Sequence, residues 1–253
     1  MKYVKTTLCA GVVLGALFMA TPALAGEFKA TRNPNPCSPA EPCPTNGKGI
    51  GTADPEHPGY SQEFRFGAFN VLCKSAHPFA KTAAEGAPTW EMSESFTTQI
   101  KFNKCLTVAH FTGFEAGIPT SITKMEFTYL PNAPGKGGEP GQVLISEANV
   151  KIGSGICTFH WGGQTVYSKP GLPVATFETL FEPVKKSAKY PTAVRESLVI
   201  NNAFRGIEFE FESGQCVGEK GFEEAATTTE GKSATYFGSI KDGVVGGSLG
   251  YVP

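Results

Sequence analysis

The segment Ile207-Glu208-Phe209-Glu210-Phe211-Glu212 alternates apolar and acidic side chains with a period of two residues. Successive side chains of a β-strand point to opposite faces of its sheet, so the segment predicts a strand with three apolar residues inward and three carboxylates outward. This acidic ladder is either a strip that binds cations or a cationic partner, or the solvated face of the strand. We favour the solvated face, balanced by lysines such as Lys101 or Lys124 on a neighbouring strand.

Upstream segments repeat the alternation, most clearly at residues 96–102, 125–129, 148–152 and 177–181. No segment carries the 3.6-residue apolar stripe of an amphipathic helix, and no fixed-period repeat is present. A dozen or so short strands with turn residues between them predict an all-β fold, an antiparallel β-sandwich. Nineteen phenylalanines indicate a packed interior.

Glycines make two finer predictions. The alternation changes phase at Gly67, between residues 64–66 and 69–73, which predicts a β-bulge. Within residues 157–167 the pair Gly162-Gly163 predicts a hairpin, because two glycines supply the positive φ that a tight two-residue turn needs.

Residues 1–25 have the form of a secretory signal peptide. Lys2 and Lys5 precede the apolar run Leu8–Ala20, and an Ala-x-Ala site ends at Ala25. The apolar run is about a dozen residues long, shorter than the roughly 20 that a membrane-spanning helix needs, so the mature protein is not expected to be integral to a membrane. We predict a secreted protein, extracellular or at the cell surface, that folds in an oxidising compartment.

The rest of the chain divides into three parts. Residues 26–60 contain seven prolines and predict an irregular Pro-rich spacer, with a presented binding segment as the alternative. The β-sandwich domain is expected over residues 61–241, and a C-terminal tail over residues 242–253.

Loss of the signal peptide removes Cys9 and leaves six cysteines, which predict a disulfide framework. Six cysteines allow 15 pairings, and sequence alone does not choose among them. Position along the chain favours one set, a local clip in the spacer and two bridges between strands. These pairs are Cys37–Cys43, Cys73–Cys105 and Cys157–Cys216.

The charged residues argue against several classes of protein. The formal charge is −1 for the whole chain and −3 without Lys2 and Lys5, and the signs are interspersed. This pattern is not that of a nucleic-acid-binding protein. Aspartate occurs only at Asp54 and Asp242, so Asp-based catalytic triads and Ca²⁺ loops are disfavoured.

Catalytic and metal-binding signals are weak. Gly246–Gly250 matches G-x-S-x-G, but the chain ends before the helix that this motif requires. Cys157 and His160 have a metal-ligand spacing, but positions three apart on a strand point to opposite faces. We predict no catalytic residue, no metal ligand and no cofactor. Trp90 and Trp161 are candidate ligand contacts, as a platform on which sugar rings could stack.

A succession of short motifs carries a resemblance. They are Ile100-Lys-Phe-Asn-Lys-Cys105, Cys157-Thr-Phe-His-Trp-Gly-Gly-Gln164, Gly214-Gln-Cys216 and Ala234-Thr-Tyr-Phe-Gly-Ser-Ile240. Over about residues 61–241 the chain resembles a group of uncharacterised secreted actinobacterial proteins, β-rich and cysteine-containing. Relatives tend to carry a further cysteine pair that is absent here. The group has no known activity, so the resemblance implies no site residue.

These observations favour a secreted, non-enzymatic binding or structural protein over an enzyme, with cell-envelope polysaccharide or protein as the class of partner. One alternative is a secreted hydrolase whose Glu or His residues converge only in the fold. A cleft holding two carboxylates would favour it. The other alternative is a carbohydrate-binding module, which requires Trp90 or Trp161 to be exposed.

Overall fold

The computed structural model describes residues 26–32, 37, 43–51, 59–66, 69–79, 92–109, 117–183, 194–214 and 233–253. All regular elements of these residues are β-strands, and every strand pair is antiparallel. The prediction of an all-β antiparallel fold is confirmed. The signal peptide predicted at residues 1–25 lies outside the described residues.

The strands, in chain order, are β1 (Glu27–Arg32), β2 (Lys48–Ile50), β3 (Gln62–Phe66), β4 (Phe69–Phe79), β5 (Met92–Ser93), β6 (Phe96–Ala109), β7 (Ile118–Ile122), β8 (Met125–Pro134), β9 (Pro140–Ile145), β10 (Ala148–Ile152), β11 (Cys157–Trp161), β12 (Gln164–Tyr167), β13 (Ala175–Pro183), β14 (Val194–Glu208), β15 (Glu210–Gly214), β16 (Ser233–Asp242) and β17 (Gly247–Val252).

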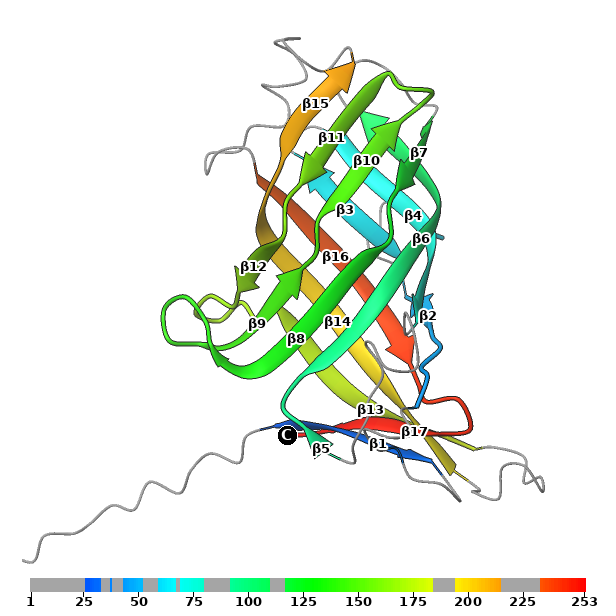
Figure 1. Cartoon of the computed structure of the whole chain (residues 1–253), viewed down its shortest axis with the longest axis vertical. Helices are drawn as coiled ribbons and strands as arrows, with labels where there is room; N and C mark the ends of the chain where they lie inside the picture. The colour runs from blue at the N-terminus through cyan, green and yellow to red at the C-terminus, as the bar shows by residue number, and fades with distance from the viewer. Residues whose placement is uncertain are drawn as a thin grey trace, which may run out of the picture.

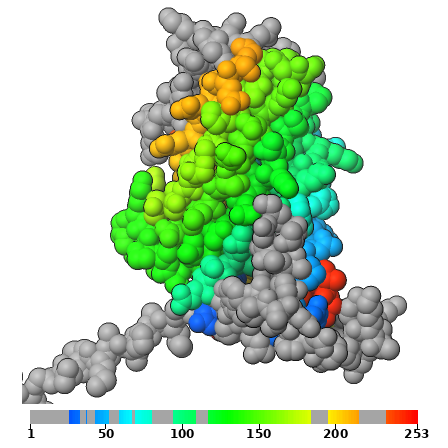
Figure 2. Space-filling view, viewed as in Figure 1, coloured from blue at the N-terminus to red at the C-terminus, as the bar shows by residue number. Residues whose placement is uncertain are grey.

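The main sheet closes on itself. Its strand order runs β13-β14-β16-β3-β4-β6-β7-β10-β11-β15. Strand β13 pairs with the outer side of β14. Strand β15 continues β14 directly after Phe209, so the sheet closes through one long segment: β14 pairs with β16, and β15 pairs with β11 (Figure 1). Opposing halves of this curled sheet pack face to face as a sandwich, and Figure 2 shows the β7–β11 wall as a continuous surface of side chains.

Aromatic rings fill the interior around Phe64 of β3. The centroid of the Phe64 ring lies 4.6 Å from that of Tyr236, 5.3 Å from that of Phe102 and 5.7 Å from that of Trp161. Aromatic pairs at such separations stabilise a core beyond their buried area. Further ring contacts extend this group along the interior; its other members are Phe66, Phe69, Phe127, Tyr129, Phe159, Phe204 and Phe209.

The two tyrosines of this core have hydrogen-bond partners. The Tyr236 hydroxyl donates a hydrogen bond to Gln62 Oε1, and the Tyr129 hydroxyl donates a hydrogen bond to Asn202 Oδ1 at 3.0 Å. Burial raises the pKa of both phenols well above the ordinary value. Each amide side chain in turn donates to a backbone carbonyl of β16 at 3.1 Å. Satisfied hydrogen bonds make these buried polar groups compatible with the core.

A second sheet, in the order β17-β1-β5, lies across the lower end of the main sheet in Figure 1. Phe28 of β1 is 2% exposed and contacts the rings of Phe96, Phe177 and Tyr251. Residues 26–60 and 242–253, predicted as an irregular spacer and a tail, contain strands β1, β2 and β17. The alternation that predicts a strand is weak here, because Phe28 and Ala30 belong to one short strand followed by a Pro-rich segment.

The bulge predicted at Gly67 lies outside the described residues. Strands β3 and β4 on either side of it pair with Phe66 opposite Phe69. A separate change of phase occurs within β6 at Lys104, whose φ of 52° lies in the left-handed region. Phe102 and Cys105 both lie in the core on either side of it. A non-glycine residue in this conformation is uncommon and carries strain.

The prediction of a hairpin at Gly162-Gly163 is wrong. Strand β11 pairs with β10 and β12 pairs with β9, so the chain continues in one direction past the two glycines. Neither glycine has the positive φ that a tight turn would need. The side-chain amide of Gln164 replaces a rung of the ladder: it donates to the carbonyl of Glu208 at 3.0 Å and accepts from the Glu208 N–H at 2.9 Å.

Disulfides cross-link the fold as predicted at two positions. Cys37–Cys43 closes a local loop, and Cys73–Cys105 joins directly opposed residues of β4 and β6. Cys157 of β11 is also disulfide-bonded, and its predicted partner Cys216 lies outside the described residues.

Substitution Phe64→Ala should lower the free energy of unfolding by about 3–5 kcal/mol, because it leaves a cavity among packed rings. Urea denaturation followed by near-UV circular dichroism measures this loss. Phe181 on β13 is 64% exposed, so the matched change Phe181→Ala should stay within about 0.5 kcal/mol of wild type. Equal losses in the two variants would contradict the assignment of Phe64 to the centre of the core.

Peptide mapping of the unreduced protein should recover a cross-linked peptide that joins Cys157 to Cys216. The expectation follows because Cys157 is oxidised and four of the other cysteines already form two bridges. Free Cys216 thiol in the denatured, unreduced protein would contradict this pairing.

Candidate functional site

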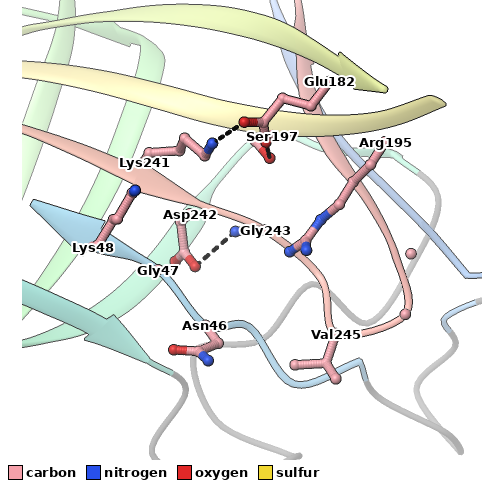
Figure 3. Close-up of a pocket in the computed structure, with 12 residues that line it drawn as sticks. Asn46, Gly47, Lys48, Glu182, Arg195, Ser197, Lys241, Asp242, Gly243 and Val245 are labelled. Carbon is pink, nitrogen blue, oxygen red and sulfur yellow. Dashed lines mark hydrogen bonds and ion pairs between the residues drawn. The ribbon is translucent and has the colours of Figure 1, made fainter. Parts of the chain in front are cut away.

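A pocket of about 470 Å³ opens where β2, β14 and β16 meet the turn that leads into β17. Glycines and charged side chains form most of its wall. The lining residues are Asn46, Gly47, Lys48, Glu182, Arg195, Ser197, Lys241, Asp242, Gly243, Val245, Gly246 and Gly247. Figure 3 shows Lys241 extended toward Glu182, and Arg195 extended toward Gly243.

Two of the cations face each other across paired strands. Lys241 of β16 lies directly opposite Lys48 of β2. Like charges at directly opposed positions of a sheet repel and are destabilising. Lys241 is neutralised by an ion pair with Glu182 of β13, whereas no ion pair of Lys48 occurs within the described part of the chain.

Glu182 is held as a carboxylate. It accepts a hydrogen bond from Lys241 at one oxygen and from the Ser197 hydroxyl, at 3.2 Å, at the other. The hydrogen bond from Lys241 is the main cause of a lowered pKa for this carboxyl. Glu182 therefore serves as the counter-ion of Lys241, and both its carboxylate oxygens already accept hydrogen bonds.

Arg195 is the cation with an unsatisfied donor. Its Nε is buried and has no hydrogen-bond partner, and no ion pair of its guanidinium occurs within the residues that the structure covers. A Cβ atom at position 243 would lie 2.6 Å from an Nη atom of Arg195, so only glycine lets the guanidinium approach this turn. A buried donor without a partner costs free energy unless a ligand or water satisfies it.

Asp242 forms the floor of the pocket and is 1% exposed. Burial raises the pKa of this carboxyl from its ordinary 3.8 to about 6, opposed by the hydrogen bond from the Gly243 N–H. The distances are 2.8 Å from Gly243 N to Oδ1 and 3.3 Å from Thr98 Oγ1 to Oδ2. Both oxygens of Asp242 thus already accept hydrogen bonds from the protein.

The candidate ligand contacts lie elsewhere. Trp161 is 1% exposed and stacks on Phe64, so it offers no exposed platform for a sugar ring. Trp90 lies outside the described residues. The acidic ladder is outward and solvated as predicted, but lysines do not balance it: β15 pairs with β11, and His160 Nδ1 lies 3.1 Å from Glu212 Oε1.

The described residues contain no group of three His, Cys, Asp or Glu side chains placed to hold a metal ion. Cys157 is buried and oxidised, while His160 is half-buried beside Glu212 on the other face of the strand. Among the same residues, no helix is long and apolar enough to cross a membrane.

Sequence reasoning did not find this pocket. Lys48, Arg195 and Lys241 come from three strands far apart in the chain, and only the register of β2, β14 and β16 brings them together. The one available signal was Asp242, one of only two aspartates in the chain. No family model, curated protein or solved structure matches this sequence.

Unfolding stability should fall as the pH rises from 5 to 7.5. The folded protein binds the Asp242 proton more tightly than the unfolded chain, so the stabilisation is complete below pH 3.8 and is lost as pH rises through 6. The loss between pH 5 and 7.5 is about 1 kcal/mol. The titration of Glu182 lies below this window, because the pKa of that carboxyl is lowered.

Thermal denaturation at fixed ionic strength measures this dependence, with Asp242→Asn as the comparison. The variant has no carboxyl to titrate at this position, so its pH dependence should be flatter than that of wild type. The same slope in both proteins would exclude Asp242 as the cause.

Proposed function

We propose that this protein is a secreted, non-catalytic binding protein that holds the anionic group of a ligand in the pocket lined by Lys48, Arg195 and Lys241. The disulfides support an oxidising compartment, and the predicted signal peptide supports secretion.

The buried Nε–H of Arg195, which has no hydrogen-bond partner, carries the proposal. Three cations line the pocket, and among the described residues only Lys241 has an acidic partner in an ion pair. An anion beside Arg195 and Lys48 would accept from the buried Nε–H and relieve the repulsion between Lys48 and Lys241. Guanidinium binds carboxylate and phosphate through two parallel hydrogen bonds, which gives such a site its geometric preference.

A hydrolase is the second candidate, because the pocket holds two carboxyl groups with pKa values moved in opposite directions. The pKa of Asp242 is raised and that of Glu182 is lowered, a pattern typical of paired catalytic acids and bases. Against this function, Asp242 is buried, and both carboxyl groups accept hydrogen bonds from the protein at both oxygens. Neither is oriented to exchange a proton with a substrate.

Isothermal titration calorimetry with galacturonate and with inorganic phosphate tests the binding function. We expect saturable binding of at least one probe and a loss of about tenfold or more in affinity in Arg195→Gln, because the variant keeps the shape but loses the charge. Arg205→Gln is the matched control, since Arg205 lies on the same strand but stacks on Phe237 outside the pocket.

Two outcomes would overturn this function. One is the absence of binding of either probe at about 10 mM, or equal binding in the Arg195 variant. The other is turnover of a polysaccharide by wild type that disappears in Asp242→Asn, which would establish the hydrolase instead.

A further inference from the structure

A row of basic side chains crosses the outer face of the sheet from this pocket. Lys241 of β16 lies opposite Lys48 of β2, and His77 of β4 lies opposite Lys101 of β6. The bridge between Asn46 and Phe79, with the bond from Gly47 N to Pro78 O at 3.0 Å, sets β2 beside β4. Two residues further along this antiparallel ladder, Lys48 comes opposite His77.

The register therefore places Lys241, Lys48, His77 and Lys101 side by side on four neighbouring strands. Strands lie about 4.8 Å apart, so the row is ~14 Å long. Lys48, His77 and Lys101 are exposed, and no acidic side chain forms an ion pair with any of them among the described residues. The directly opposed Lys48 and Lys241 repel each other, and a bound polyanion lowers that cost.

The far end of the row widens into a shallow hollow of about 680 Å³ beside Lys101. Its lining adds polar and aromatic side chains to the basic ones. Ser75 and Asn103 can form hydrogen bonds, and half-buried Phe79 offers an aromatic surface. Lys104, the residue held with φ at 52°, also lines this hollow. Strained backbone conformations are concentrated at binding and catalytic sites.

We propose that the anionic ligand is a chain, an acidic polysaccharide that lies across β16, β2, β4 and β6 along this row. The proposal rests on the proposed function, because the pocket at Arg195 holds one acidic group of the chain. The remaining row binds further acidic groups at Lys48, His77 and Lys101.

The chemistry of the hollow favours a polysaccharide over other polyanions. Hydroxyl and amide groups at Ser75 and Asn103 match the hydroxyl groups of sugars, and the ring of Phe79 can pack against the apolar face of a sugar ring. The row runs across the strands, where β4 pairs with β6, and β2 pairs with β16 and is bridged to β4. A peptide that adds to a sheet needs a free strand edge, and between β16 and β6 the described strands of the row already have these partners.

Calorimetric titrations with polygalacturonate, galacturonate, neutral dextran and polyglutamate test the proposal. Polygalacturonate should bind at least about tenfold more tightly than galacturonate per site, with a steeper loss of affinity as salt rises. Lys101→Glu should weaken polygalacturonate binding about tenfold and leave galacturonate binding unchanged, because Lys101 lies outside the pocket. Lys151→Glu on β10, an equal change at another exposed position, should alter neither.

The outcomes separate this proposal from the one on which it rests. Unchanged polygalacturonate binding in Lys101→Glu overturns the polysaccharide row and leaves the pocket function intact. Unchanged galacturonate binding in Arg195→Gln overturns the pocket function. Polyglutamate binding as tight as that of polygalacturonate, or no polymer binding by wild type, also overturns the choice of an acidic polysaccharide.

Discussion

The constraint on which the rest of this structure depends is the continuous segment of β14 and β15, which pairs with strands on two sides of the sheet. Strand β14 pairs with β16, and after Phe209 the same chain segment pairs as β15 with β11. The Gln164 amide joins the two regions by bonding to the backbone of Glu208. Since this strand closes the sheet, inward residues of all walls meet in one aromatic core, and outward residues of distant segments become neighbours.

The alternation of apolar and polar residues was enough to predict the strands that line this core. Residues 96–102, 125–129 and 148–152 bury the side chains that the period of two assigned to the interior. Glycine was ambiguous, because Gly162-Gly163 can form either a turn or a break within a continuing strand. Only pairing with β9 and β10, residues outside the local window, decides between these two conformations. The left-handed conformation of Lys104 has no signature in residue type.

The pocket was beyond prediction for a related reason. Lys48, Arg195 and Lys241 are unremarkable in their own segments, and their meeting depends on the register between β2, β14 and β16. A net charge sums over the whole chain, so the value of −1 does not reveal that Lys48, Lys101 and Lys241 lie near one another on the surface. The scarcity of aspartate was informative in another sense: Asp242 is buried beneath those cations, where its charge opposes theirs only after it loses its proton.

The pairing of β1 with β17 has a consequence for the order in which the chain can fold. Residues 27–32 pair with residues 247–252, so their partner is synthesised after all the strands of the main sheet. Contacts of such sequence separation are slow to form, because nearly the whole chain must be brought together in one loop. Until then Phe28 and the lower end of the aromatic core lack their cover. A chain still emerging from the ribosome would therefore expose aromatic surface at that end until residues 247–252 are made.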